Sequence, residues 1–111
     1  DGYFLYLGRI DIHHKGLDIL LKAYNIVLKK YPWLRLKIAG DGRDRNKFLL
    51  LLDKFGLKNN VEFLGWTEET EKKDILRKAM FIVVPSRYET QAIVVLEAAA
   101  VAKAVIVSNI N

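Results

Sequence analysis

Short hydrophobic runs alternate along the chain with longer segments whose apolar residues recur every three or four positions. The short runs predict buried β-strands at residues 2–10, 34–40, 59–65, 81–85 and 104–108. In the first run, GYFLYLGRI, aromatic and aliphatic residues are nearly continuous rather than alternating with polar ones. Such a run is typical of a strand that is covered on both faces.

Start and stop signals set the limits of the predicted helices between these strands. The first helix begins at Leu17, and its unbroken apolar stripe stops at Pro32. The second is expected to end at Gly56, a left-handed C-cap followed by a leucine that makes the usual hydrophobic contact. The third is expected to begin at Thr67 as its N-cap, with two glutamates in its first turn. A fourth helix is expected at residues 92–102.

Strands that alternate with helices and short loops predict an α/β fold. We expect a Rossmann-like, doubly wound parallel sheet of about five strands with helices on both faces, because right-handed crossovers place a helix after each strand. The 111 residues are enough for one domain, residues 1–111, with a single substantial core. No apolar run reaches the roughly 18 residues that cross a bilayer. The absence of cysteine excludes disulfides, thiolate metal sites and cysteine nucleophiles.

Polar and glycine-rich segments follow the predicted strands. Ligands of such sheets bind beyond the carboxyl ends of the strands, where the strand order reverses. The residues expected at this edge are Gly8, Arg9, Lys15 and Gly16 after the first strand, Gly40, Asp41, Gly42 and Arg43 after the second, Gly65 after the third, and Ser86, Arg87, Tyr88 and Glu89 after the fourth.

Two cations flank the first of these turns. Arg9 and Lys15, with Gly16 opening a helix, offer positive charge and free backbone N–H groups of the kind that bind phosphate. The alternative is a solvated basic loop. His13 and His14 lie in the same segment and are expected to be exposed loop residues, because adjacent histidines without further ligands do not form a metal site.

The GDG segment at residues 40–42 fits neither the G-x-G-x-x-G pattern nor a P-loop. This argues against a standard NAD site and against a kinase or ATPase. Its glycines predict either a tight turn or the close approach of the backbone to a ligand.

Glu89 and Glu97 are the most specific polar pair in the chain. Glu97 lies within an aliphatic run, where a carboxylate is costly unless it is paired, hydrogen-bonded or protonated. If both carboxylates face the ligand site at the carboxyl ends of the strands, they can accept hydrogen bonds from the adjacent hydroxyl groups of a sugar or a ribose. The alternative places Glu97 on the exposed face of an amphipathic helix.

Charge alone leaves several classes of ligand open. Eighteen Lys and Arg against thirteen Asp and Glu give a net charge of +5. The basic residues are spread along the chain without interleaved aromatic residues, so nucleic-acid binding is not expected. A response regulator would need clustered aspartates, whereas Asp11 and Asp41 follow different strands. A non-catalytic Rossmann-like module that binds a nucleotide or a partner through the same edge stays open as an alternative.

Four segments carry a resemblance to a known family. They are YLGRI with KGLDILLKAY, then LKIAGDGRDR, then VEFLGW, and finally VPSRYETQAIVVLEAAAVAKAVIVSN. In this order, and over essentially the whole chain, they resemble the C-terminal, nucleotide-binding half of retaining glycosyltransferases of the GT-B fold (glycosyltransferase family 4, group 1 type).

The resemblance implies transfer of a hexosyl group from a nucleotide-diphosphate sugar, such as a UDP-, GDP- or ADP-hexose, to a glycan, lipid or polysaccharide with retention. The sugar nucleotide is a substrate, and neither a cofactor nor a metal ion is implied. Arg9 and Lys15 would neutralise the diphosphate of the leaving group, Glu89 would contact the donor sugar, and Glu97 would accept from the ribose hydroxyls. The segment 61–65 would lie near the base. The other implied binding residues are Gly8, Gly40, Gly42, Gly65, Thr90, Gln91 and Ala92.

The chain departs from the family in the segment that follows Glu89. Glycines usually follow the first glutamate in a pattern like E-G-F-G, whereas Glu89 is followed here by Thr90, Gln91 and Ala92. Thr90 and Gln91 could offer side-chain hydrogen bonds in place of backbone approach. Family members have an N-terminal, acceptor-binding domain before this point, so the chain is expected to be a fragment of a larger two-domain protein and to be inactive in isolation. The full-length protein is expected in the cytoplasm or at the inner face of a membrane.

Overall fold

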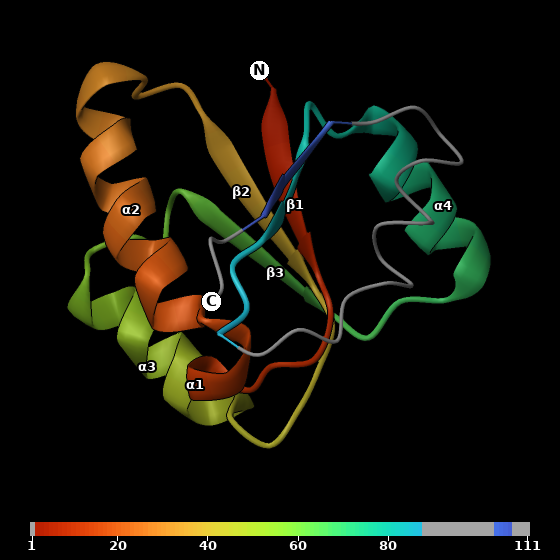
Figure 1. Cartoon of the computed structure of the whole chain (residues 1–111), viewed down its shortest axis with the longest axis horizontal. Coiled ribbons are helices and arrows are strands. Elements are labelled where there is room, and N and C mark those ends of the chain that lie inside the picture. The colour runs from red at the N-terminus through yellow and green to blue at the C-terminus, as the bar shows by residue number, and fades with distance from the viewer. Residues whose placement is uncertain (1, 88–103, 108–111) are drawn as a thin grey trace.

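The computed structural model describes residues 2–87 and 104–107, which form a parallel sheet with flanking helices (Figure 1). The elements in chain order are β1 (Tyr3–Leu7), α1 (Ile12–Lys15), α2 (Leu17–Lys30), β2 (Arg35–Ala39), α3 (Arg45–Lys54), β3 (Val61–Gly65), α4 (Glu69–Lys78), β4 (Ile82–Val84) and β5 (Val105–Val107). None of the described helices combines the length and the apolar character that crossing a membrane requires.

The sheet confirms the predicted parallel architecture. Its strand order is β3-β2-β1-β4-β5, and every described pair of neighbours is parallel. After β3 the chain returns past β2 and β1 to form β4 on the other side of β1. The strand order therefore reverses between β1 and β4, and the carboxyl ends of these two strands mark the expected ligand site.

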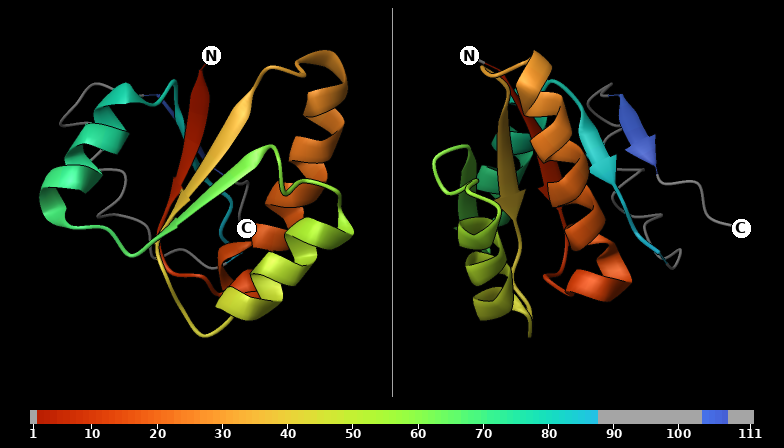
Figure 2. Two further views of the ribbon diagram at one scale, coloured as in Figure 1. Left: turned by 180° about the vertical axis from the view of Figure 1, so that it is seen from behind. Right: turned by 90° about the vertical axis from the view of Figure 1, so that its left-hand side faces the viewer.

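Helices cover both faces of the sheet, as predicted. Figure 2 shows α2 and α3 on one face and α4 on the other. Along β1, Phe4 and Tyr6 contribute to the core under α2 and α3, whereas Leu5 and Leu7 contribute to the core under α4. Successive side chains of a strand point to opposite faces, so an entirely apolar strand can contribute side chains to the hydrophobic cores on both faces of the sheet. This explains why the GYFLYL run lacks the alternation of a half-exposed strand.

The predicted cap at the end of α3 is confirmed. Gly56 has a φ of 71°, and the N–H of Leu57 donates to the carbonyl of Leu52 at 2.9 Å. The N–H of Gly56 donates to the carbonyl of Asp53 at 3.0 Å. These two bonds define a Schellman motif, and the buried Leu57 closes it with an apolar contact.

Two local predictions are wrong. Thr67 is not the N-cap of α4, because Glu68 holds that position and makes no side-chain capping bond. Glutamates in the first turn offset the missing cap through the helix dipole. His13 and His14 do not lie in a loop, because residues 12–15 form the extra short helix α1. The predicted helix at residues 92–102 lies outside the described residues.

Tyr24 ties α2 to the loops that precede β2 and β3. Its hydroxyl contacts the carbonyl of Leu34 at 2.5 Å and that of Asn60 at 3.1 Å, and burial raises the pKa of Tyr24 to about 12. We expect Tyr24→Phe to lower the free energy of unfolding by about 1–3 kcal/mol, because buried carbonyls lose their donor. Urea unfolding will measure this change. Tyr31→Phe is the control, since Tyr31 is 42% exposed; equal effects of the two substitutions would contradict the prediction.

Candidate functional site

Hydrogen bonds to backbone carbonyl groups fix the turn that follows β1. The N–H of Gly8 donates to the carbonyl of Ala39 at 3.0 Å, and the hydroxyl of Tyr6 donates to the carbonyl of Arg9 at 2.6 Å. Burial raises the pKa of Tyr6 far above its ordinary value, so this hydroxyl remains a donor at any physiological pH. The main chain of Arg9 is held in place while its side chain is exposed at the sheet edge.

Gly40 and Gly42 let the loop after β2 pack against the turn after β1. A Cβ atom at Gly40 would lie 1.7 Å from the carbonyl oxygen of Gly8, and one at Gly42 would lie 2.6 Å from that of Ile10. The two loops are also joined by a hydrogen bond from the N–H of Ile10 to the carbonyl of Asp41 at 3.0 Å. The close approach that the sequence predicted at these glycines is therefore accounted for by the neighbouring loop. Their contact with a ligand stays a prediction.

Gly65 joins the end of β3 to the same edge. It is buried, has a φ of 71°, and accepts a hydrogen bond from the N–H of Gly40 at 2.7 Å. Three of the predicted glycines, Gly8, Gly40 and Gly65, thus belong to one connected set of loops.

Lys15 lies at the end of α1 rather than in an open loop. The structure leaves it only 5% exposed. The helix is fixed at its start, where the carboxylate of Asp11 accepts from the N–H of His14 at 3.3 Å and that of Asp44 accepts from the N–H of Ile12 at 2.8 Å. The short helix, rather than an open loop, therefore sets the position of Lys15.

A hollow of about 420 Å³ lies at this edge, between the loops after β1 and β2. It is lined by Arg9, Ile10, Asp11, Gly42 and Arg43. Arg43 pairs with Asp11 at 3.1 Å. Burial would raise the pKa of Asp11, but hydrogen bonds from His14 and Arg43 hold it below its ordinary value. The hollow therefore presents cations and an ionised carboxylate rather than an acid that could donate a proton.

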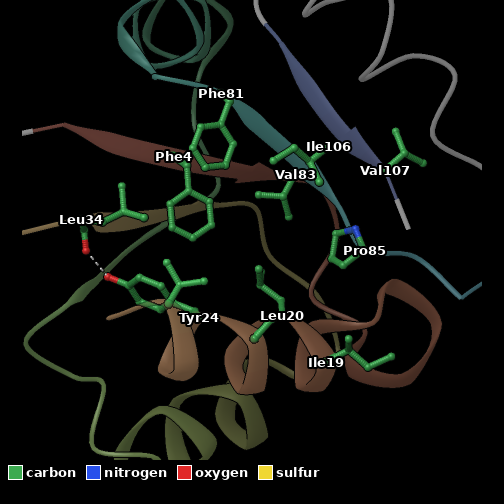
Figure 3. A pocket seen from close by; sticks show the side chains of 12 residues that line it. Phe4, Ile19, Leu20, Tyr24, Leu34, Phe81, Val83, Pro85, Ile106 and Val107 are labelled. Atoms are coloured by element: carbon green, nitrogen blue, oxygen red, sulfur yellow. Dashed lines mark hydrogen bonds between the residues drawn. The ribbon is translucent and has the colours of Figure 1, made fainter. Parts of the chain in front are cut away.

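A second concavity, of about 330 Å³, lies on the face of the sheet that α2 covers (Figure 3). Side chains of α2, β1, β4 and β5 line it, including Leu20, Phe4, Val83 and Ile106. Of the labelled side chains, Tyr24 alone carries a hydroxyl group, and this hydroxyl donates a hydrogen bond to the carbonyl of Leu34. This apolar groove offers no charge to a diphosphate, so we place the candidate site at the sheet edge.

Within the described residues, no three His, Cys, Asp or Glu side chains come together to hold a metal ion. His13 is exposed and His14 is partly buried, both within α1. Glu89, Thr90, Gln91, Ala92 and Glu97 lie outside the described residues, so their predicted roles stay predictions.

The structure adds an ion pair that the sequence did not reveal. The guanidinium group of Arg87, just after β4, donates to both carboxylate oxygens of Asp18 at 2.9 and 3.0 Å. These residues are 69 positions apart, so no local pattern links them. The one available signal was an acidic residue in the first turn of a predicted helix.

This ion pair predicts an acid-dependent stability. Hydrogen bonds from Arg87 hold the pKa of Asp18 below its ordinary value, so the pair stabilises the fold above the unfolded pKa of about 3.9. That stability is lost as the pH falls through the lower, folded pKa. We expect Asp18→Asn to lower the free energy of unfolding by about 1 kcal/mol at pH 7, with a smaller difference near pH 3. Urea unfolding at both pH values tests this, and a difference that is the same at both would contradict it.

The fold and the edge define a class: a parallel α/β domain whose cationic, glycine-rich loops meet at the carboxyl ends of the strands. The whole chain, residues 1–111, matches the family model described as glycosyl transferases group 1. The chain belongs to this family, and its fold is that of the C-terminal half of a GT-B glycosyltransferase.

Individual relatives agree with this assignment. The chain is 34% identical to an uncharacterized glycosyltransferase of Methanocaldococcus jannaschii, over 96% of this chain and 27% of the relative. It is 32% identical to a glycogen synthase of Mycobacterium tuberculosis, over 96% of this chain and 26% of that protein. The catalytic domain of cholesterol-α-glucosyltransferase from Helicobacter pylori superimposes with a TM-score of 0.83 and 30% identity, covering 97% of this chain and 65% of that one. The chain spans about a quarter of the length of these curated relatives.

Proposed function

We propose that this chain is the donor-binding domain of a retaining glycosyltransferase that transfers a hexosyl group from a nucleotide-diphosphate sugar to a glycan, lipid or polysaccharide. One observation carries the proposal: the exposed Arg9 and the hollow beside it lie at the carboxyl ends of β1 and β2, next to the point where the strand order reverses between β1 and β4. Open α/β sheets bind their ligands at this position. The similarity to a glycogen synthase and to a cholesterol-α-glucosyltransferase supports the same class of reaction.

The proposed roles follow from charge and hydrogen bonding. Arg9 and Lys15 would stabilise the negative charge that develops on the departing nucleoside diphosphate. This stabilisation would lower the activation barrier of the transfer. Glu89 would hold the donor sugar, and Glu97 would accept from the ribose hydroxyls. The acceptor would bind to an N-terminal domain, so we propose that the isolated domain binds donor without transferring its sugar. Independence from metal ions, and a place in the cytoplasm or at the inner face of a membrane, remain predictions from the family resemblance.

A second candidate function rests on one feature of the sequence. The family's two glycines after the first glutamate are replaced by Thr90 and Ala92. Larger residues there suit a Rossmann-like module that binds a nucleotide, or a partner, without processing a sugar. This module would bind a nucleoside diphosphate and its sugar conjugate with equal affinity, whereas a donor-binding domain would distinguish them.

Calorimetric titration in the presence of EDTA tests the proposal. The protein is titrated with UDP, GDP and ADP, and then with the hexose conjugate of the preferred nucleotide. We expect saturable binding that favours one base and a measurable change in affinity when the hexose is present. Binding of none of the three nucleotides at millimolar concentration would contradict the proposed function.

A further inference from the structure

Arg87 connects the end of β4 to both α1 and α2. Its backbone N–H donates to the carbonyl of His14 at 3.0 Å, and its Nη1 donates to the carbonyl of His13 at 3.0 Å. The same guanidinium group forms the two hydrogen bonds to Asp18, in the first turn of α2. Figure 1 shows the cyan end of this segment lying beside α1. One residue thus contacts two helices that are about 70 positions away in the sequence.

These contacts stabilise a helix that is too short to be stable alone. The helix α1 has four residues, and a single turn does not offset the cost of its own nucleation. Arg87 donates to the carbonyl groups of His13 and His14 at the C-terminal end of α1, where its positive charge is favourable. Lys15, the proposed diphosphate cation, is the last residue of this helix.

A second contact holds the same two segments together. A Cβ atom at Gly16 would lie 2.0 Å from the carbonyl oxygen of Pro85, so the backbone after α1 packs directly against the backbone after β4. Gly16 has a φ of 66°, which a residue with a side chain rarely adopts. The two loops therefore meet through backbone packing as well as through Arg87.

We infer that Asp18 and Arg87 are positioning residues for the donor site: their ion pair fixes α1, with Lys15, against the segment that follows β4. This inference rests on the proposed function. Breaking the pair would let Lys15 move relative to Arg9, the other proposed contact of the diphosphate. Small displacements of binding groups are costly to affinity and rate.

The test measures nucleotide affinity and stability in the same variants. The purified protein is titrated with whichever of UDP, GDP and ADP the wild type binds most tightly. Asp18→Asn keeps the size of the side chain but removes the charge that holds Arg87. We expect about tenfold weaker binding, together with faster hydrogen exchange in residues 13–18. Asp74→Asn is the matched control, because it makes the same charge change in the exposed Lys78–Asp74 pair, 3.3 Å long, on α4. Its affinity should equal that of the wild type.

Arg87→Lys provides the second arm, since lysine keeps the charge but cannot form a two-pronged pair. We expect it to weaken binding about as much as Asp18→Asn, and the double variant to bind no worse than either single one. Wild-type affinity in Asp18→Asn would overturn the positioning role and leave the proposed function standing. An equal loss of affinity in Asp74→Asn would also overturn it, because the effect would then follow charge alone. Failure of the wild type to bind any of the three nucleotides would instead contradict the proposed function itself.

Discussion

Gly40→Ala is expected to unfold the protein or to lower its free energy of unfolding by about 3–5 kcal/mol. A Cβ atom at this position would lie 1.7 Å from the carbonyl oxygen of Gly8, and the φ of Gly40 is 150°. The nearest atoms all belong to the backbone of Gly8, so no side-chain rotation can relieve the clash. The loops after β1 and β2 would have to separate, which would break the hydrogen bond between Gly8 and Ala39. Urea unfolding followed by circular dichroism measures the loss.

Gly56→Ala is the control for this substitution. Gly56 also has a positive φ, of 71°, but no atom lies within 4 Å of the added Cβ. It should cost only about 1–2 kcal/mol, the ordinary penalty for a left-handed residue with a side chain. Equal costs at the two glycines would show that conformation, and not the packing of the two loops, makes glycine necessary at residue 40.

Arg9→Ala is expected to weaken the binding of a nucleoside diphosphate at least tenfold while leaving the fold intact. A charge-assisted hydrogen bond to phosphate contributes about 1.5–3 kcal/mol, and about 1.4 kcal/mol corresponds to tenfold in affinity. The side chain is exposed, and the bond from Tyr6 is made to the main-chain carbonyl, so stability should change by less than about 0.5 kcal/mol. Calorimetric titration and urea unfolding measure the two quantities.

Lys54→Ala is the matched control for Arg9→Ala. Lys54 is an exposed cation at the end of α3, and a helix that leads into the next parallel strand ends at the opposite edge of the sheet. Its removal changes the net charge by the same amount. If both variants lost affinity equally, general charge rather than a defined phosphate contact would explain binding.

The order of strands and helices could be predicted because it depends on patterns that are local in the sequence. Continuous apolar residues marked β1 as covered on both faces, and Gly56 marked the end of α3. Strand ends then placed Gly8, Gly40 and Gly65 at one edge, where hydrogen bonds join Gly8 to Ala39 and Gly40 to Gly65.

The remaining features depend on contacts between distant segments. The helix α1 is a single turn that relies on Asp44 and Arg87, which are 32 and 74 positions from their partners. The pair of Asp18 and Arg87 has no local signature for the same reason. Lys15 was expected in the segment between the first strand and the helix that begins at Leu17, but its placement in α1 makes it buried. Thr67 satisfied the usual preference for an N-cap, yet the acidic first turn of α4 starts one residue later.

Backbone amide chemical shifts will locate the bound nucleoside diphosphate, which we expect at the carboxyl ends of β1 and β2, next to the point where the strand order reverses. The labelled protein is titrated with UDP, GDP and ADP, and the perturbed amides are mapped onto the fold. We expect the largest shifts in residues 8–16 and 40–43, with little change at residues 31–35 on the opposite edge or in the apolar groove beside α2. Largest shifts in that groove or at the opposite edge would contradict the site, and saturation without any shift in residues 8–16 would contradict the roles of Arg9 and Lys15.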